Sequence, residues 1–433
     1  MSENQHILLG VAGSPVLHSR SPYMFREIFR HKKIDGAYIR CAVSTASDAA
    51  RLIGELKFRG MNITAPFKES VIPFINSISG DAGSIGAVNT ILNSDSSLTG
   101  FNTDFLGVTE PLVKRTGSLK GKKCLVLGAG GAGIAAAYGL RKEGAEVIIL
   151  NKFIGQGEEA AAKTGSLFRK LESLRGEITD SDIIVNTIPY EIGALDIRGI
   201  KIGALFFDAG YKKSHYCDLA PELGFEFIGG EEWLIHQGIH ACGHFLGFLP
   251  DEKILSDALE SAHEMKGIIS LTGFMATGKS SIGMLLAEKM GYEFADTDAI
   301  IEKKQSMSIT DIFRNYGEEK FREMETDVLL SFRGKKGIVL SCGGGAVIKE
   351  ENRNFLAEET LPFWLYTSME ETLRRGNDGT RPLLEGMKSP EELIPLFSRR
   401  IGMYASLYGT LVISEGEPEK ITELINEEIR LSF

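Results

Sequence analysis

The chain has 433 residues, of which 43% are hydrophobic and 24% are charged, enough apolar material for two or three folded domains. Its 58 Asp and Glu residues outnumber its 48 Lys and Arg residues, which gives a net charge of -10. No stretch is basic enough to follow a nucleic-acid backbone. The composition thus excludes a disordered chain and argues against a nucleic-acid partner, whereas a few arginines could still bind a small anionic substrate.

The five cysteines are widely separated and form no C-x-x-C pair, which argues against a zinc knuckle and against a disulfide framework. The longest uncharged run, residues 124–140, is too short and too rich in glycine for a membrane-spanning helix. The first five residues are polar and do not have the pattern of a signal peptide. We therefore expect a cytoplasmic protein with no membrane partner.

Short β-branched runs alternate with helical patterns along the whole chain, which predicts α/β domains with mostly parallel sheets. Strands are expected at residues 6–11, 123–127, 146–150, 183–186, 205–208, 268–272 and 338–341. A helical pattern over residues 251–265 comes directly before the strand at 268, so the main boundary is placed between residues 265 and 266. Since no Pro- or Ser-rich linker separates them, the two halves are expected to be closely joined.

The strand at 123–127 runs into a glycine-rich turn and an alanine-rich helix. The turn reads Gly128-Ala129-Gly130-Gly131-Ala132-Gly133. This G-x-G-x-x-G between a strand and a helix predicts dinucleotide binding, because the backbone and the helix N-terminus can approach a pyrophosphate. The alternative is a turn that only packs the helix on the sheet.

The second strand of this region ends at Asn151-Lys152. An Asp or Glu usually binds the free ribose 2′-hydroxyl of NAD near this position, and here a cation takes its place. The pattern therefore favours NADP(H) over NAD, although Lys152 is also compatible with a solvated loop lysine.

The strand at 268–272 leads into a second phosphate-binding motif, Gly273-Phe274-Met275-Ala276-Thr277-Gly278-Lys279-Ser280, followed by Ser281. This G-x-x-x-x-G-K-[ST] loop predicts ATP binding. Its N–H groups cradle the phosphates, Lys279 reaches the β- and γ-phosphates, and the Ser280 hydroxyl suits Mg²⁺.

Two carboxylates follow the next strand, in Asp296-Thr297-Asp298. Residues at i and i+2 share one face of an extended segment, here at the carboxyl end of a strand beside the phosphate loop. One of the two carboxylates can hold Mg²⁺ through water and the other can accept the proton of a substrate hydroxyl, and we assign the metal to Asp296 and the proton to Asp298. An acidic turn without catalytic function is the alternative.

Residues 1–265 resemble shikimate dehydrogenase in motifs that follow the order and spacing of that family. They are His18-Ser19-Arg20-Ser21-Pro22, Asn62-Ile63-Thr64-Ala65-Pro66-Phe67-Lys68, Gly86-Ala87-Val88-Asn89-Thr90, Asn102-Thr103-Asp104 and Gln237-Gly238. Residues 266–433 resemble shikimate kinase. There the phosphate loop is joined by Asp296-Thr297-Asp298, Phe321-Arg322 with Glu325, Gly343-Gly344-Gly345, Arg381-Pro382 and Arg400. The product of the first enzyme would be the substrate of the second.

The dehydrogenase resemblance implies an α/β substrate lobe at residues 1–104, completed by helices at 234–265, and a Rossmann NADP-binding lobe at 105–233. It implies that 3-dehydroshikimate receives a hydride from NADPH at its ring carbonyl, with Lys68 and Asp104 handling the proton. It assigns the contacts to the substrate's carboxylate and hydroxyls to Ser19, Ser21, Thr64, Asn89, Asp104, Tyr211 and Gln237.

The kinase resemblance implies a P-loop α/β domain with a parallel sheet at residues 266–433, which phosphorylates shikimate from Mg-ATP. It assigns the catalytic roles to Lys279, Asp298 and Arg381, the last on a mobile lid that closes over the transferring phosphoryl group. It places shikimate against Asp298, Gly344 and the carboxylate-binding Arg322 and Arg400.

Several residues depart from the dehydrogenase family pattern. Lys152-Phe153 replaces an arginine and a threonine after the second cofactor strand, and Glu232 and Trp233 replace a glycine and a methionine before the last helix. The added bulk and charge raise the possibility of weaker cofactor binding.

A stripe of histidines on one helical face is formed by His236, His240 and His244. Such a stripe could bind zinc, but the family pattern around it favours a structural role.

These observations predict a bifunctional shikimate-pathway enzyme that uses NADP(H), ATP and Mg²⁺. Two alternatives remain open at this point. In one, only the kinase is active and the dehydrogenase half is vestigial; in the other, the chain is a nucleotide-sensing regulator that catalyses neither reaction. The intact Lys68, Asp104, Lys279, Asp298 and Arg381 argue against the regulator. No oligomeric state follows from the sequence.

Overall fold

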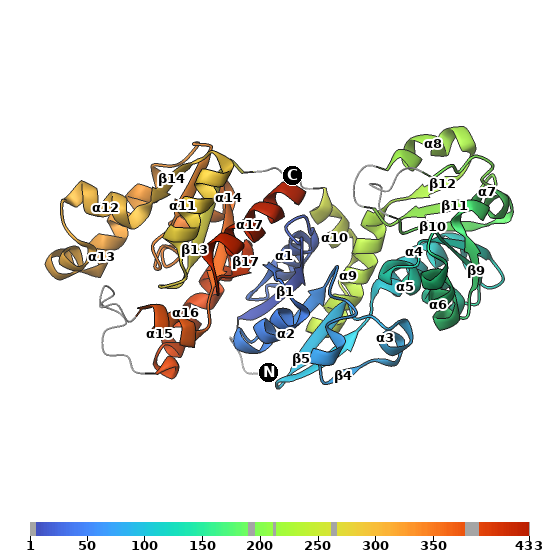
Figure 1. The fold of residues 1–433 in the computed structure, drawn as a ribbon, viewed down its shortest axis with the longest axis horizontal. Coiled ribbons are helices and arrows are strands. Elements are labelled where there is room, and N and C mark those ends of the chain that lie inside the picture. Colours follow the sequence, from blue (N-terminus) through green and yellow to red (C-terminus); the bar gives the residue numbers. More distant parts are fainter. Residues whose placement is uncertain (1–5, 189–194, 211–213, 261–265, 377–388, 433) are drawn as a thin grey trace. The chain divides into compact units, whose positions relative to one another are not determined.

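The computed structural model describes residues 6–188, 195–210, 214–260, 266–376 and 389–432 (Figure 1). The chain divides into two compact units, one of residues 1–65 and 262–433 and one of residues 66–261. The first unit therefore combines the N-terminal segment with the C-terminal part of the chain.

Eight parallel strands form one continuous sheet in the first unit. Their order is β14 (Glu293–Asp296), β15 (Ile338–Ser341), β13 (Ile268–Gly273), β16 (Thr360–Tyr366), β17 (Thr410–Ile413), β2 (Gly36–Ala42), β1 (Ile7–Gly13) and β3 (Gly60–Ile63). β13 and β16 are buried along their whole length, as expected for central parallel strands that are covered on both faces.

The helices of this unit connect successive strands, except α17, which follows the last strand. They are α1 (Ser21–Lys32), α2 (Ala46–Glu55), α11 (Lys279–Met290), α12 (Thr297–Gln305), α13 (Ile309–Leu330), α14 (Glu350–Glu359), α15 (Met369–Gly376), α16 (Ile394–Ala405) and α17 (Pro418–Ser432). Because parallel strands need a crossover between them, these helices follow from the strand directions.

The second unit contains a separate sheet of six parallel strands, in the order β12 (Glu226–Ile228), β11 (Leu205–Asp208), β10 (Ile183–Asn186), β7 (Lys123–Leu127), β8 (Glu146–Asn151) and β9 (Leu167–Lys170). The order reverses beside β7, the strand that leads into the first glycine-rich turn, and ligands of doubly wound folds bind at such a point. A small ribbon in the same unit pairs β5 (Thr90–Ser94) antiparallel and β4 (Ser77–Ile78) parallel with β6 (Ser97–Phe101).

The helices of the second unit are α3 (Gly80–Ile85), α4 (Asp104–Thr116), α5 (Gly131–Lys142), α6 (Ile154–Thr164), α7 (Leu174–Glu177), α8 (His215–Leu223), α9 (Gly230–Leu246) and α10 (Glu252–Leu259). Its apolar core lies on both faces of the six-stranded sheet, with alanines of α5 packed against β7 and β8.

The seven strands expected from the sequence are all present, with ends that differ by at most two residues. The expected helix at 251–265 begins at Glu252, and its last five residues lie outside the described part. The α/β fold class with parallel sheets is confirmed. The division at residues 104, 233 and 265 stays a prediction. Within the described residues, no helix is long and apolar enough to cross a membrane.

Candidate functional site

The second phosphate loop connects β13 to α11 and depends on two glycines. Gly273 has a φ of 142°, and a Cβ there would lie 2.3 Å from the Leu365 carbonyl oxygen. Gly278 has a φ of 80° directly before the first residue of α11. Both positions therefore require glycine, and together they place the helix N-terminus beside the carboxyl end of the strand.

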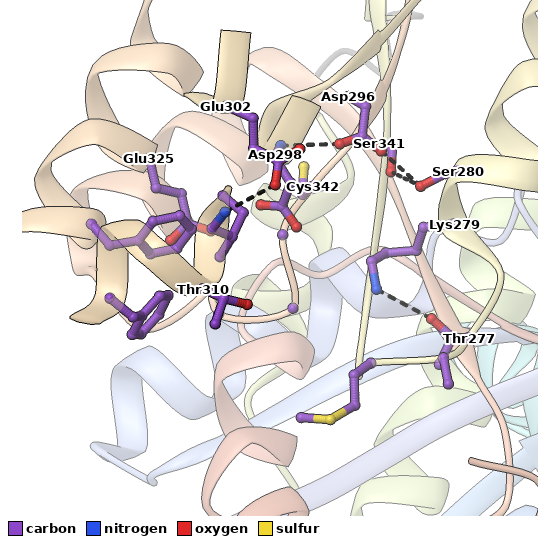
Figure 2. A pocket seen from close by; sticks show the side chains of 18 of the residues that line it. Thr277, Lys279, Ser280, Asp296, Asp298, Glu302, Thr310, Glu325, Ser341 and Cys342 are labelled. Atoms are coloured by element: carbon purple, nitrogen blue, oxygen red, sulfur yellow. Dashed lines mark hydrogen bonds between the residues drawn. The ribbon is translucent and has the colours of Figure 1, made fainter. Parts of the chain in front are cut away.

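Lys279 and Ser280 are the first two residues of α11, and both line this site (Figure 2). The Lys279 ammonium donates to the Gly273 and Phe274 carbonyl oxygens at 3.0 and 2.8 Å, and its contact with Thr277 is drawn in Figure 2. The Ser280 hydroxyl donates to Asp296 Oδ2 at 2.7 Å. Asp296 caps α12 through its other oxygen, which accepts from the N–H of Asp298 and of Ala299. A hydroxyl and a carboxylate thus lie together next to the loop, a donor set that suits Mg²⁺.

Asp298 lies deeper in the same site. Its Oδ1 is buried and has no hydrogen-bond partner among the described residues. Burial raises the pKa of Asp298, and the neighbouring Asp296 carboxylate raises it further. An unpaired buried carboxylate oxygen is costly in a folded protein, so its position here is typical of a group that awaits a hydrogen-bond donor from a ligand.

Two buried arginines face this pocket. Arg322 pairs with Glu325 at 2.8 Å and with Glu318 at 3.0 Å, and Arg400 donates to the Gly344 carbonyl oxygen at 3.1 Å. A Cβ at Gly345 would lie 2.3 Å from both terminal nitrogens of Arg322. The bare backbone of the glycine triplet therefore makes room for the guanidinium.

The buried Glu325 carboxylate balances the positive charge of Arg322. The Glu325 side chain is fully buried, and burial raises its pKa while Arg322 opposes that shift. Because the guanidinium keeps its charge next to this carboxylate, Arg322 can hold a planar carboxylate ligand.

A single cavity of about 770 Å³ brings the kinase residues predicted from the sequence together. Its lining includes Ala276, Thr277, Gly278, Lys279, Ser280, Ser281, Asp296, Asp298, Arg322, Gly344 and Arg400. Gly273 is not among the lining residues, and its carbonyl oxygen accepts a hydrogen bond from Lys279. Arg381 lies outside the described residues.

Two residues of this site were not assigned a role from the sequence. Glu325 is the buried partner of Arg322, and Tyr404 donates to the Gly344 carbonyl oxygen at 2.7 Å. The spacing of Arg322 and Glu325 on one helix, three residues apart, was a usable signal for the first. No sequence pattern pointed to Tyr404, because its partner Gly344 lies 60 residues earlier in the chain.

A second site lies in the unit of residues 66–261. Lys68 Nζ donates to Asp104 Oδ2 at 2.7 Å, and Asp104 is almost wholly buried at the first turn of α4. The Asp104 N–H donates to Asn102, and the Val88 N–H donates to the Lys68 carbonyl oxygen at 2.8 Å. Backbone contacts on both sides therefore orient the lysine and the carboxylate toward each other.

Asn89 and Gln237 extend this site. The Asn89 amide donates to Gln237 Oε1 at 3.1 Å and to Thr103 Oγ1 at 3.0 Å, while its oxygen accepts from the Thr103 N–H. The hydrogen bonds set the orientation of the Asn89 amide and of the Gln237 carbonyl oxygen that accepts from it. Four predicted residues, Lys68, Asn89, Asp104 and Gln237, thus lie in one unit.

The other residues expected to contact the substrate lie in the first unit or outside the described residues. Ser19 and Ser21 are half-buried at the start of α1, and Thr64 directly follows β3, all in the unit of residues 1–65 and 262–433. Tyr211 lies outside the described residues. Whether these four join Lys68 and Asp104 stays a prediction.

The first glycine-rich turn has the geometry of a dinucleotide loop. Gly128 has a φ of 102°, and a Cβ at Gly133 would lie 2.1 Å from the Gly128 carbonyl oxygen, so this turn packs tightly against α5. Gly130 and Gly131 have nothing within 4 Å of where a Cβ would stand. The N-terminus of α5 is therefore open to a pyrophosphate, which fits NADP(H).

The end of β8 supplies the residues expected beside an adenine ribose. Asn151 is buried and donates to the Phe153 carbonyl oxygen at 3.0 Å, whereas Lys152 and Phe153 are exposed. An exposed cation at this position fits a 2′-phosphate better than a free hydroxyl.

The two substituted residues Glu232 and Trp233 lie in the first turn of α9 and have structural partners. Glu232 pairs with Arg115 of α4, whose Nη1 lies 3.0 Å from Glu232 Oε2. Trp233 is buried and tilts against Phe207, with a centroid distance of 5.8 Å. A Cβ at Gly107 would lie 2.5 Å from Trp233 Cδ1, so the large and the small residue are complementary.

The histidine stripe on α9 also has local partners. His236 Nδ1 and His240 Nε2 lie 2.9 and 2.6 Å from the Glu110 carboxylate, and His244 stacks on Phe101. No group of three potential metal ligands occurs among the residues that the structure describes.

Comparisons with known proteins separate the same two parts. Family models described as the shikimate dehydrogenase substrate-binding domain and as shikimate/quinate 5-dehydrogenase match residues 11–91 and 111–191, and one described as shikimate kinase matches residues 275–430. The NADP(+) shikimate dehydrogenase of Carboxydothermus hydrogenoformans is 34% identical over 270 residues, 58% of this chain and 96% of that protein. The shikimate kinase of Geobacter sulfurreducens is 46% identical over 138 residues, 32% of this chain and 76% of that protein.

This chain belongs to the shikimate dehydrogenase and shikimate kinase families. The crystal structure of the Thermus thermophilus shikimate 5-dehydrogenase in complex with NADP(H) and shikimate is 31% identical, with a TM-score of 0.54, over 59% of this chain and 98% of that chain. The protein is a bifunctional shikimate-pathway enzyme, an NADP-dependent dehydrogenase joined to a kinase. Matches of this extent to both families do not favour a vestigial dehydrogenase half or a regulator without catalysis.

Proposed function

We propose that Lys68 and Asp104 carry the proton of the dehydrogenase reaction. When 3-dehydroshikimate is reduced, the carbonyl oxygen gains negative charge and needs a proton. Lys68, held 2.7 Å from Asp104, is oriented to supply it, and in the reverse direction the same lysine accepts a proton from the hydroxyl. The observation that carries this assignment is the pairing of the half-buried Lys68 with the buried Asp104, together with the Asn89–Gln237 hydrogen bond.

NADPH supplies the hydride for this step. Gly128, Ala129, Gly130, Gly131, Ala132 and Gly133 are the residues proposed to hold its pyrophosphate, with Asn151 and Lys152 at the adenine ribose. Ser19, Ser21, Thr64, Asn89, Tyr211 and Gln237 are proposed to hold the substrate. Polar side chains suit this task because an analogue that lacks a hydroxyl leaves them unpaired.

In the kinase part, Asp298 is proposed as the group that accepts the proton of the shikimate hydroxyl. Arg322 and Arg400 are proposed to hold the shikimate carboxylate against Gly344. Lys279 and the N–H groups of residues 276–281 would hold the ATP phosphates, with Arg381 supplying further positive charge. Ser280 and Asp296 would hold Mg²⁺, which neutralises phosphate charge when bound.

We also propose a cytoplasmic location and a division into a substrate lobe at 1–104 with helices at 234–265, a Rossmann lobe at 105–233 and a kinase domain at 266–433. The cysteines Cys41, Cys124, Cys217, Cys242 and Cys342 are all free thiols, which suits a reducing compartment.

Product analysis by mass spectrometry tests both halves in one tube. Purified protein is incubated with 3-dehydroshikimate, NADPH and Mg-ATP, and a parallel tube receives NADH. We expect shikimate 3-phosphate in the NADPH tube and less product with NADH.

Two variants separate the half-reactions. Lys68→Ala should lower the dehydrogenase kcat about a thousandfold and leave the kinase activity unchanged. Lys279→Met should lower the kinase kcat about a thousandfold and leave the dehydrogenase activity unchanged. If Lys279→Met left shikimate-dependent ATP consumption unchanged, the phosphate-loop assignment would be wrong. Unreduced 3-dehydroshikimate in the wild-type tube would contradict the dehydrogenase assignment.

A further inference from the structure

The kinase part and the N-terminal segment share one sheet. β17, the last strand of the kinase, pairs in parallel with β2, in the register Thr410↔Arg40, Leu411↔Cys41 and Val412↔Ala42. Both strands are edge strands of their own part, and each covers the unpaired backbone groups of the other. Contacts beside the pair include Tyr366 to Glu55 at 2.8 Å and Arg51 to Glu415 at 2.9 Å.

The last helix of the kinase reaches further into the N-terminal segment. Glu428 of α17 accepts, through Oε2, the N–H groups of Val16 and Leu17, each at 2.8 Å. Glu428, Val16 and Leu17 are all buried, with exposed fractions of 1%, 0% and 1%. A carboxylate that accepts two backbone N–H groups in a buried place is a strong and directional contact.

Arg40 completes this contact from the other side. Its Nε and Nη2 donate to the Ser19 carbonyl oxygen at 3.0 and 2.7 Å, and its Nη1 lies 3.5 Å from the Tyr408 carbonyl oxygen of the kinase part. The segment 16–19 is therefore held by Glu428 at its first two residues and by Arg40 at its last. Arg40 is itself placed by the strand pairing, since it stands opposite Thr410.

We propose that the kinase part positions the substrate loop of the dehydrogenase, with Glu428 as the positioning residue. The held segment leads directly into Ser19 and Ser21, so this inference rests on their proposed role at the substrate. Glu428 is not among the residues proposed to bind substrate or cofactor. It acts by holding the backbone from which the two serines project.

The geometry predicts which kinetic constant depends on Glu428. If the loop is less ordered, its serines bind the substrate more weakly. Lys68, Asp104 and the cofactor turn belong to other segments, which Glu428 does not hold. Removal of the carboxylate should therefore raise the KM of the dehydrogenase for its substrate and leave its kcat and its KM for NADP(+) nearly unchanged.

The test compares variants of the full chain in both assays, shikimate oxidation with NADP(+) and shikimate phosphorylation with Mg-ATP. For Glu428→Ala we expect the dehydrogenase KM for shikimate to rise about tenfold, with its kcat and both kinase constants within about twofold of wild type. Glu428→Gln retains an acceptor oxygen and should restore the KM to within about threefold of wild type. The matched control, Glu427→Ala, changes the exposed neighbour on the same helix and should change nothing.

An unchanged KM in Glu428→Ala would overturn the inference. So would a parallel fall of dehydrogenase and kinase kcat in that variant, because it would show a general loss of structure in α17. Ser21→Ala separates this result from the proposed function. If Ser21→Ala raises the KM and Glu428→Ala does not, only the positioning role is wrong; if Ser21→Ala has no effect either, the substrate loop itself is misassigned and both fail.

Discussion

At the scale of single residues, the kinase pocket shows how glycine positions decide where charges can lie. Gly345 leaves space for the Arg322 guanidinium, and Gly343 would place a Cβ within 2.7 Å of both Asp298 and Glu325 oxygens. Side chains at either position would push these groups apart. The glycine triplet is therefore as much a part of the ligand site as the charged residues around it.

Arg322→Lys tests whether the planar guanidinium is required. A lysine keeps the charge but cannot pair with Glu318 and Glu325 while also offering two parallel donors to a carboxylate. We expect the kinase KM for shikimate to rise by about ten- to a hundredfold, corresponding to about 1.5–3 kcal/mol. The KM for ATP and the dehydrogenase activity should change little, which steady-state kinetics with each substrate varied in turn would show. An equal rise in both kinase KM values would contradict the assignment.

At the scale of elements, α9 packs against α4 through two kinds of residue. Trp233 departs from the family pattern, and His236 and His240 belong to the stripe that could suggest a metal site. Trp233 fills the space that Gly107 of α4 leaves open, and Glu110 of α4 accepts from His236 and His240. The packing of α4 against α9 explains both features without a ligand.

Gly107→Ala tests the size match between these helices. The added Cβ would meet Trp233 Cδ1 at 2.5 Å and the Trp233 carbonyl oxygen at 2.8 Å. We expect a loss of about 1–3 kcal/mol in the free energy of unfolding, measured by urea denaturation. Adding Trp233→Met should relieve part of the loss, because only the side-chain clash disappears. If the losses in the free energy of unfolding caused by Gly107→Ala and Trp233→Met simply added in the double variant, this account would be contradicted.

Glu110→Gln tests the contact with the histidines. Burial raises the pKa of Glu110, but the two histidines outweigh it and hold that pKa at about 2, below its usual 4.5. A carboxylate with a lowered folded pKa stabilises the protein above its ordinary pKa, and this contribution is lost as the pH falls from 4.5 toward 2. Since Glu110 is partly exposed, we expect Glu110→Gln to cost only about 1 kcal/mol at pH 7.

The difference from wild type should shrink as the pH falls below 4.5. Trp233 fluorescence during urea denaturation, in a Trp364→Phe background, reports on this unit. The exposed Glu222→Gln serves as the control. A difference that stays constant down to pH 3.5 would exclude the carboxylate as its source.

At the scale of the whole molecule, the pairing of β17 with β2 makes the kinase and the N-terminal segment one folded unit. A strand edge left unpaired is a site of association or aggregation. We therefore expect each part to aggregate more readily when the other is removed. The two enzymes are thus joined by a sheet as well as by the chain.

Cleavage at the junction tests this arrangement. With a protease site inserted between residues 265 and 266, we expect the two pieces to remain associated after cleavage, with a dissociation constant on the order of 1 μM or tighter. Light scattering after size-exclusion chromatography would show it. Glu428→Ala should weaken the association. Pieces that separate cleanly and keep the thermal stability of the intact chain would show that the shared sheet contributes little.

The local elements and the candidate residues of each site could be predicted from the sequence. Phosphate loops, strand runs and the Lys68, Asp104, Lys279 and Asp298 positions depend on short-range patterns, because glycine conformations and side-chain chemistry are properties of a few neighbouring residues. Only the folded structure shows that Glu428 contacts Val16 and Leu17, that Trp233 fills the space beside Gly107, and that β17 lies beside β2. These contacts join residues far apart in the chain, and their geometry depends on how whole sheets and helices pack, which no local pattern encodes.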